Sequence, residues 1–256
     1  MPRRTVDLNA DLGEEVTDDR ALLQVVTSAN VACGYHAGTP AVMRAVCEEA
    51  VARSVTLGAQ VSYADRANFG RVVVDVAPSV LTEQVADQVG MLTEIARAAG
   101  ASVAYLKPHG ALYHRAAADD ATARAVLSGS GSLPVLGMPG STMLALATAA
   151  GRATRHEGFP DRGYTAAGTL VPRSEPGALV TDSATIAARA VELAATVDSV
   201  CVHGDSPDAV RHAIEARQAL STAGFEVTTC WATSTLGRHR TRRDAGHDRR
   251  ADHPRR

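Results

Sequence analysis

The chain has 256 residues, a hydrophobic fraction of 45% and a formal net charge of −2. This length allows one large domain or two small ones, and a chain of this size can bury a large core without a metal or disulfide staple. No apolar stretch approaches membrane-spanning length, and no signal-peptide pattern opens the chain. Four widely spaced cysteines without a C-x-x-C motif fit a reducing compartment, so we expect a cytoplasmic protein that does not contact a membrane.

Short apolar runs alternate with amphipathic, helix-like segments along the chain. Residues 40–53, 78–99 and 206–222 give clear helical patterns, and Thr39 followed by Pro40 is a helix-start signal. The predicted strands cover residues 5–8, 30–33, 55–59, 102–106, 134–137, 155–159, 199–202 and 225–229, and the other predicted helices cover 18–27, 119–127, 141–150 and 183–196.

This alternation is typical of an α/β fold with a parallel sheet. Seven or eight such units in about 230 residues favour a closed β/α barrel over an open sheet. No G-x-G-x-x-G motif follows the first strand, and no G-x-x-x-x-G-K-[ST] motif occurs, which disfavours a dinucleotide fold and a phosphate-loop nucleotidase. Residues 60–77 and 158–181 are long stretches without predicted structure, and such stretches often line a site.

The end of the chain differs from the rest in charge. Residues 237–256 contain eight arginines and three aspartates, whereas residues 1–236 carry 18 basic and 25 acidic side chains. The last segment has no apolar periodicity, so we predict one barrel domain over residues 1–236 and a disordered basic tail over 237–256. A solvated extension is the simpler interpretation of this tail, and nucleic-acid binding is not expected.

Lys107 is the only lysine among the 26 basic residues, and it stands in the segment Leu-Lys-Pro-His-Gly at 106–110. Lysine is a compact point charge on a thin stem, and its pKa responds to burial in ways that arginine does not reproduce. The use of arginine at every other basic position therefore indicates that Lys107 has a specific task.

Polar residues gather where the predicted strands end. Asn9 and Asp11, Lys107 and His109, and His203 and Asp205 are each spaced by two, so each pair lies on one side of an extended backbone. The carboxyl ends of parallel strands meet at one edge of the fold, where ligands bind. His36, Gln60, Arg66, Asp161 and Arg162 follow other strands at the same edge.

Such a set supports hydrolysis or group transfer, and two chemistries remain open. Histidines 36, 109 and 203 with Asp11 form a candidate site for a divalent metal that activates water. Alternatively, Asp11 acts as a general base while Lys107 and His109 stabilise an oxyanion.

Several long motifs resemble the LamB/YcsF family, the A subunits of 5-oxoprolinases. These are residues 6–14 (VDLNADLGE), 28–38 (SANVACGYHAG), 106–113 (LKPHGALY), 161–164 (DRGY), 171–174 (VPRS) and 201–205 (CVHGD). The resemblance covers about residues 5–230. It implies a seven-stranded parallel β/α barrel related to glycoside hydrolases and deacetylases. It also implies ATP-dependent hydrolysis of the lactam 5-oxo-L-proline to L-glutamate together with B and C subunits, with ATP used by the complex.

The strand ends and the resemblance together define candidate residues. We expect Asp11, Lys107 and His109 to be catalytic, with Arg162 or Arg173 holding the substrate carboxylate. The full candidate set for substrate binding is Asn9, His36, Gln60, Arg66, Asp161, Arg162 and Arg173, and the candidate metal ligands are Asp11, His36 and His203.

One departure from the family pattern leaves alternatives open. Residues 58–66 read GAQVSYADR where the family pattern has GAHPSYPDR, so Gln60 replaces a histidine. An amide does not exchange a proton near neutral pH and is a poor metal ligand. The chain could therefore be a catalytically weakened subunit with a ligand-binding or regulatory role. A further alternative is a stand-alone metal-dependent hydrolase of the deacetylase type. Independently of its function, the chain could form an oligomer.

Overall fold

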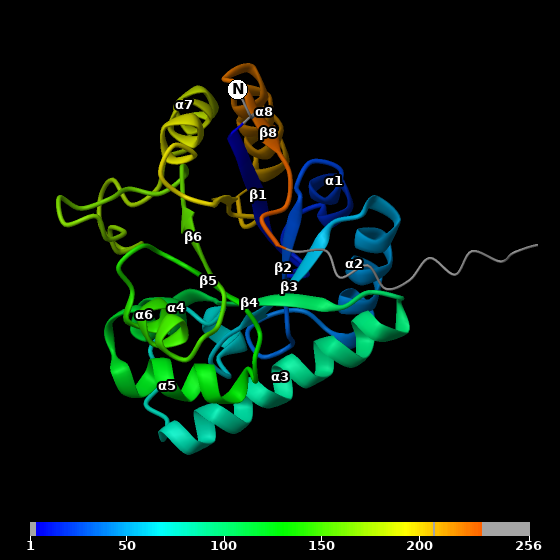
Figure 1. Ribbon diagram of the computed structural model, residues 1–256, viewed down its shortest axis with the longest axis vertical. Coiled ribbons are helices and arrows are strands. Elements are labelled where there is room, and N and C mark those ends of the chain that lie inside the picture. The colour runs from blue at the N-terminus through cyan, green and yellow to red at the C-terminus, as the bar shows by residue number, and fades with distance from the viewer. Residues whose placement is uncertain (1–3, 207, 232–256) are drawn as a thin grey trace, which may run out of the picture.

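Seven parallel strands close into a barrel in the computed structural model, which describes residues 4–206 and 208–231 (Figure 1). Strand β1 pairs with both β2 and β7, which closes the ring. The predicted seven-stranded barrel is therefore confirmed. The strands are β1 (Arg4–Leu12), β2 (Ser28–Ala32), β3 (Thr56–Val61), β4 (Val103–Pro108), β5 (Val135–Gly137), β6 (Thr154–Gly158) and β7 (Ser199–Val202), and β8 (Phe225–Val227) pairs only with the start of β1.

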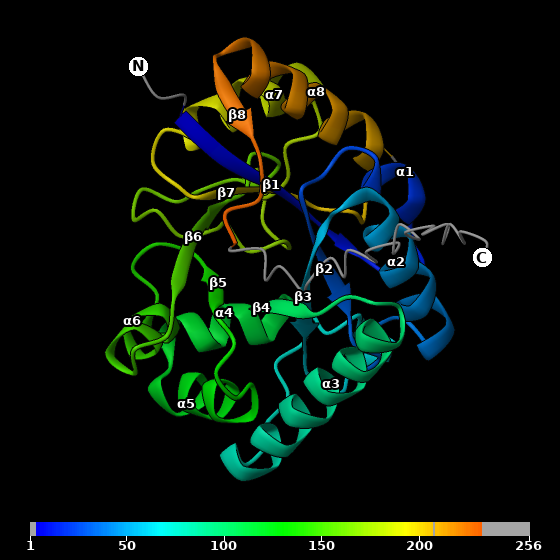
Figure 2. The same ribbon diagram turned by 45° about the vertical axis from the view of Figure 1, so that its right-hand side comes forward.

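Helices surround the barrel, as Figure 2 shows, with α7 and α8 side by side next to β8. The long helix α3 packs against α5 and α2. None of the helices in the described part of the chain is both long and apolar enough to cross a bilayer. The helices are α1 (Asp19–Leu23), α2 (Pro40–Arg53), α3 (Pro78–Ala98), α4 (Gly110–Ala118), α5 (Asp120–Gly129), α6 (Thr142–Ala149), α7 (Ser183–Leu193) and α8 (Ala209–Thr222).

Local sequence signals explain most of these boundaries. The Thr39 hydroxyl accepts a hydrogen bond from the Val42 amide at 3.2 Å and caps α2, as predicted. The predicted helix over residues 18–27 is wrong beyond α1, because the Thr27 amide already donates to Leu8 O of β1 at 2.8 Å. Helix α4 was not predicted, although its buried residues at 111, 112, 113 and 116 follow helical spacing.

Strand β1 shows how the barrel separates polar from apolar side chains. Val6, Leu8, Ala10 and Leu12 belong to the hydrophobic core outside the strands, whereas Asp7, Asn9 and Asp11 alternate with them. Asp7 and Asn9 are fully buried, and Asp11 is 4% exposed. The barrel interior therefore contains hydrogen-bonding and charged groups, each of which needs a partner.

An aromatic stack fills the end of the barrel at which the strands begin. Tyr105 stacks on Trp231 with ring centroids 4.4 Å apart and an interplanar angle of 8°. The Tyr105 ring lies across the barrel beside Gly58, where an added Cβ would lie 2.3 Å from two ring carbons. Only glycine leaves room for the ring, which explains this small residue in the middle of β3.

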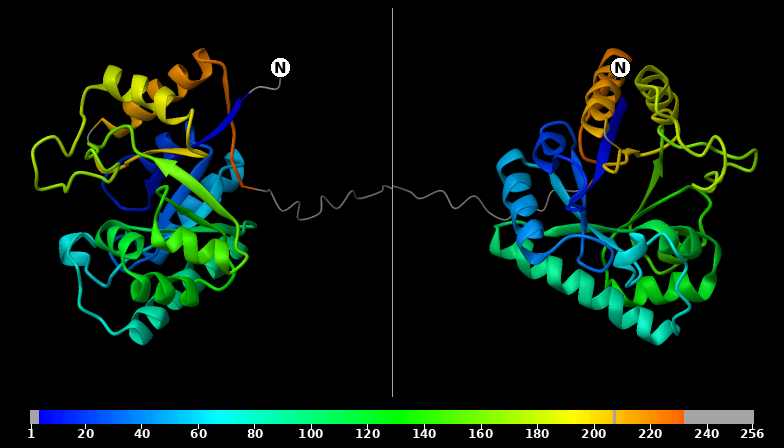
Figure 3. Two further views of the ribbon diagram at one scale, coloured as in Figure 1. Left: turned by 60° about the vertical axis from the view of Figure 1, so that its left-hand side comes forward. Right: turned by 180° about the vertical axis from the view of Figure 1, so that it is seen from behind.

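Two long loops lie at the opposite end of the barrel. Residues 62–77 contain a short 3₁₀ turn at Arg66–Asn68, and residues 159–182 contain isolated bridges that pair Arg162 with Leu179 and Tyr164 with Leu170. The second loop projects from the barrel in Figure 3. The predicted basic tail, residues 237–256, lies outside the described residues.

Replacing Gly58 by Ala tests the fit between β3 and Tyr105. We expect Gly58→Ala to lower the free energy of unfolding by about 3 kcal/mol, because a methyl group overlaps the ring in a packed interior. Urea denaturation followed by circular dichroism measures this change. Gly90→Ala is the matched control: Gly90 lies in α3 with nothing within 4 Å of an added Cβ, so this variant should gain about 0.5–1 kcal/mol.

Candidate functional site

Lys107 forms the floor of the site at the end of β4. Its ammonium donates to Asp11 Oδ1 at 3.0 Å and to Cys201 Sγ at 3.1 Å, and it lies 3.3 Å from Glu157 Oε2. These partners come from β1, β7 and β6, so the lysine joins strands across the barrel. All four side chains are buried. The three donors of the lysine ammonium match these three partners in number.

The pair of Lys107 and Asp11 stays ionised because each partner stabilises the charge of the other. Burial alone disfavours the charged lysine, but the negative partners, Asp11 first, raise the pKa of Lys107 well above its ordinary value. Burial likewise opposes ionisation of Asp11, but Lys107, helped by His203 and His109, lowers the pKa of Asp11 well below its usual range. The floor therefore holds a permanent cation beside a permanent carboxylate.

A column of hydrogen bonds inside the barrel fixes the direction of Asp11. Asn30 donates to Asp11 Oδ1 at 2.9 Å and to Asn9 Oδ1 at 2.7 Å, while Asn9 donates to Ser199 Oγ at 2.7 Å. Tyr105 donates to Asn30 Oδ1 at 2.6 Å and orients that amide. Because Oδ1 of Asp11 accepts from both Asn30 and Lys107, Oδ2 remains as the less occupied oxygen.

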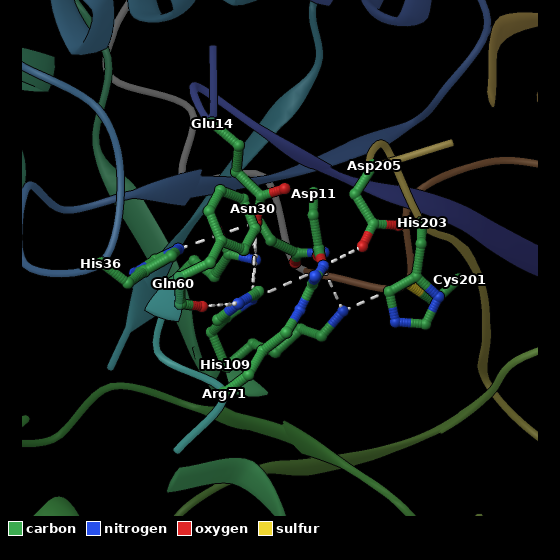
Figure 4. A network of polar contacts seen from close by, with 12 residues as sticks. Asp11, Glu14, Asn30, His36, Gln60, Arg71, His109, Cys201, His203 and Asp205 are labelled. Atoms are coloured by element: carbon green, nitrogen blue, oxygen red, sulfur yellow. Dashed lines mark hydrogen bonds and ion pairs between the residues drawn. The ribbon is translucent and has the colours of Figure 1, made fainter. Parts of the chain in front are cut away.

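A second, neutral centre lies beside the ion pair (Figure 4). Glu14 Oε1 lies 3.4 Å from His109 Nδ1 and 3.6 Å from His36 Nε2, and Gln60 Nε2 lies 3.0 Å from Glu14 Oε1 and 2.9 Å from His109 Nδ1. Burial, with repulsion from Asp11 and Asp205, raises the pKa of Glu14 to about 8.

The two histidines of this centre are held uncharged. Burial lowers the pKa of His36 to about 4, and burial together with the neighbouring His36 lowers the pKa of His109 well below its ordinary value. Their rings stack with centroids 4.1 Å apart and an interplanar angle of 12°. Neither ring nitrogen of His36 has a hydrogen-bond partner among the described residues.

Glu14, His36 and His109 are the candidate metal ligands that the described residues bring together, with donor atoms within 4.8 Å of one another. Of the residues predicted for a metal site, this set keeps His36 and His109 and adds Glu14, whereas Asp11 and His203 are not part of it. Asp11 Oδ2 lies 3.9 Å from His109 Nδ1, and His203 is paired with Asp161 instead, at 3.0 Å. Burial alone would lower the pKa of His203, but the Asp161 carboxylate outweighs this effect and raises the pKa.

Above the floor lies a cavity of about 660 Å³. Asp11 is the one carboxylate among the described residues that line this cavity. The basic side chains of the wall are Arg71, Arg115, Arg162, Arg173, His114 and His203. Arg162 is 2% exposed and donates to Ala178 O at 3.0 Å and to Val171 O at 2.8 Å. No ion pair within the described residues involves Arg162, so its charge is available to an anionic ligand.

The cavity contains some of the predicted residues and excludes others. Asp11, Lys107, His109, Arg162, Arg173 and His203 line it, whereas Asn9, His36, Gln60, Arg66 and Asp161 do not. Asn9 lies deeper in the barrel, and Arg66 instead donates to Gly34 O at 3.1 Å and holds a loop. Asp161 contacts Nδ1 of His203 through both carboxylate oxygens, at 3.1 and 3.0 Å.

Sequence reasoning missed Glu157, Arg71 and the role of Glu14. Glu157 is the last residue but one of β6, in a segment whose pattern indicates only a strand, and no local motif marks its charge. Arg71 pairs with Asp205, which also lies 3.2 Å from Arg173, so one carboxylate joins three loops at the rim. Glu14 closes the VDLNADLGE motif, and that position is the signal that could have identified it.

Comparisons with known proteins agree over nearly the whole chain. The model of the LamB/YcsF family matches residues 6–235. The A subunit of a 5-oxoprolinase from Streptomyces coelicolor is 53% identical over 245 residues, covering 87% of this chain and 98% of the relative. The crystal structure of a lactam utilization protein from Thermus thermophilus is 35% identical with a TM-score of 0.81, covering 88% of this chain and 99% of that one.

A more distant likeness concerns the fold alone. The catalytic domain of a peptidoglycan N-acetylglucosamine deacetylase from Eubacterium rectale has a TM-score of 0.51 at 13% identity, covering 89% of this chain and 88% of that one. The expected relationship to the barrels of deacetylases is thus seen in the arrangement of the strands.

The raised pKa of Glu14 predicts a specific pH dependence of stability. The folded state binds this proton up to about pH 8, whereas an unfolded glutamate releases it at about pH 4.3, so the contribution of Glu14 to stability falls as pH rises through this window. The loss is at most about 1.4 kcal/mol per pH unit. We expect Glu14→Gln to gain stability relative to the wild type between about pH 5 and about pH 8. Denaturant titrations across this range measure the difference, with the exposed Glu94→Gln in α3 as control; an unchanged difference across the range would contradict the assignment.

Proposed function

The chain belongs to the LamB/YcsF family, and from this premise we propose that it is the A subunit of a 5-oxoprolinase. In this role it opens the lactam 5-oxo-L-proline hydrolytically to L-glutamate, with ATP consumed by a complex that includes B and C subunits. The observation that carries the proposal is the buried pair of Lys107 and Asp11 on the floor of a cavity with arginine-rich walls.

Lactam hydrolysis requires a group that stabilises the oxyanion formed when water adds to the carbonyl carbon. Lys107 is suited to this task because its charge is permanent and its position is fixed by three strands before substrate binds. An ammonium held in a buried site interacts with developing charge more strongly than one in water, because the local dielectric constant is low.

Asp11 is suited to orient the attacking water through Oδ2. Its depressed pKa makes it a weak base at rest, because Lys107 stabilises the carboxylate. When negative charge develops on the substrate oxygen beside Lys107, part of that stabilisation is withdrawn, and the proton affinity of Asp11 rises as the water loses its proton. His109, whose Nδ1 lies 3.9 Å from Asp11 Oδ2, is the third member of the predicted catalytic set and lines the cavity beside this carboxylate.

The substrate carboxylate is best matched by Arg162. Its guanidinium is buried in the cavity wall and is anchored by two backbone carbonyls, which leaves part of the donor fork for a ligand. Arg173 is paired with Asp205 and is the second candidate. A small five-membered lactam fills only part of a cavity of about 660 Å³, which leaves room for partner groups at the mouth.

ATP use is assigned to the complex rather than to a phosphate-binding loop of this chain. The sequence contains no G-x-x-x-x-G-K-[ST] motif, and opening a stable five-membered amide requires an energy source. The names of the relatives, which describe them as A subunits, support assembly with other subunits, and the rim loops around the cavity are where such subunits would control access.

Replacing Lys107 by methionine tests the proposed oxyanion group. We expect kcat for glutamate formation by the reconstituted complex to fall about 10²–10³-fold, because the fixed positive charge beside the developing oxyanion is lost. Arg124→Met, which breaks only an exposed pair with Asp120 in α5, should leave kcat unchanged. Circular dichroism establishes that each variant is folded. A folded Lys107→Met protein with wild-type kcat sinks the proposal.

Replacing Arg162 by lysine tests substrate binding separately from catalysis. Lysine keeps the charge but not the planar fork, so KM for 5-oxo-L-proline should rise about 10–100-fold with a smaller effect on kcat. Steady-state kinetics of the same complex measure both constants. An unchanged KM would contradict the assignment of the carboxylate site to Arg162. Arg173→Lys would then test Arg173 in the same assay.

A further inference from the structure

We infer that Gln60 is a positioning residue that replaces a metal ion as the connecting element between Glu14 and His109. Its amide donates to Nδ1 of His109, holds this ring in place and keeps the Glu14–His36–His109 centre free of metal. This inference concerns the centre itself and does not depend on which substrate the cavity accepts.

The tautomer of His109 follows from its two contacts. The ring Nε2 lies 3.1 Å from the Phe69 carbonyl oxygen, which can only accept, so Nε2 carries the hydrogen. In an uncharged ring, Nδ1 then has a lone pair and accepts from Gln60 Nε2 at 2.9 Å. The orientation of the amide is fixed by the same contact, since its oxygen facing Nδ1 would oppose two lone pairs.

The second hydrogen of the Gln60 amide connects His109 to the carboxyl group. It points to Glu14 Oε1 at 3.0 Å, so one NH₂ group joins a residue that follows β1 to one that follows β4. Gln60 is fully buried in β3 and does not line the cavity. It therefore acts through His109, which does line the cavity, and not by contact with a ligand.

The arrangement of the rings opposes a shared metal ion. The lone pair of an imidazole nitrogen lies in the ring plane, and zinc binds it at about 2.0–2.1 Å along that direction. The rings of His36 and His109 are stacked within 12° of parallel at a centroid distance of 4.1 Å, so their lone pairs lie in two separate planes. One ion cannot lie in both planes. In addition, the lone pair of His109 Nδ1 already accepts a hydrogen bond from the Gln60 amide.

The stack has supports on its edges as well. Phe69 contacts both rings in edge-to-face geometry, at 5.7 Å from His36 and 5.5 Å from His109. Its backbone is left-handed, with φ of 57°, which directs the carbonyl oxygen of the same residue to His109 Nε2. Turning either histidine to meet a metal therefore breaks the contact with Phe69 or the one with Gln60.

Two variants of the full-length chain test the inference without an activity assay. In Gln60→His, a ring nitrogen replaces the amide, and we expect zinc affinity by isothermal titration calorimetry to rise at least about 10-fold over the wild type. In Gln60→Met, a side chain of similar length without a donor, Nε2–H of His109 still faces Phe69 O, so long-range ¹H–¹⁵N spectra should show a shifted Nδ1 signal, because this nitrogen loses its hydrogen-bond donor.

The outcomes decide the question in either direction. A wild-type chain that binds one equivalent of zinc as tightly as Gln60→His, with the His36 and His109 signals shifting together, overturns the inference. An unchanged Nδ1 signal of His109 in a folded Gln60→Met chain overturns the positioning role. Weak zinc binding by the wild type, a gain in Gln60→His and a shifted Nδ1 signal in Gln60→Met support it. Gln88→Met, which removes the other buried glutamine, is the control for loss of an amide alone.

Discussion

The ion pair between Lys107 and Asp11 is the constraint on which the interior of this barrel depends. A charge buried in protein costs several kcal/mol unless a partner and further hydrogen bonds compensate it. Here the compensation extends along the whole axis: Lys107 contacts three strands, Asp11 is held by Asn30, and Asn30 is held by Asn9 and Tyr105. Removing one member takes a hydrogen bond or an ion pair from the next, so the members of this column depend on one another.

Two centres with opposite electrical character share this end of the barrel. The floor around Lys107 is permanently ionised, whereas Glu14, His36 and His109 are uncharged near neutral pH. The difference arises from position relative to the lysine, because its cation stabilises Asp11 directly while Glu14 faces two histidines and an amide. Separated pKa values of this kind are how one site provides both a fixed charge and a group that holds a proton.

Much of the fold was predictable because its signals are local. The cap of α2, the glycine after α3 and the buried strand β7 each depend on a few neighbouring residues. The clustering of Asp11, Lys107 and His109 was predictable from the geometry of parallel strands alone. Glu157 and the contact of Gln60 with His109 were not predictable, because each depends on which residues face one another across the barrel. Arg66 contacts a neighbouring loop and does not line the cavity, which was not predictable because a strand-end position does not determine which way a long side chain turns.

The stack of Tyr105 and Trp231 has an electrostatic consequence for the site. It places polarisable but uncharged material at the end of the barrel where the strands begin, so water does not screen the polar column from that side. Field lines from Lys107 and Asp11 therefore leave the protein mainly through the cavity. An anion that approaches the cavity mouth therefore meets an electrostatic field set by Lys107 and Asp11, which lie deeper in the barrel than the residues that the anion touches.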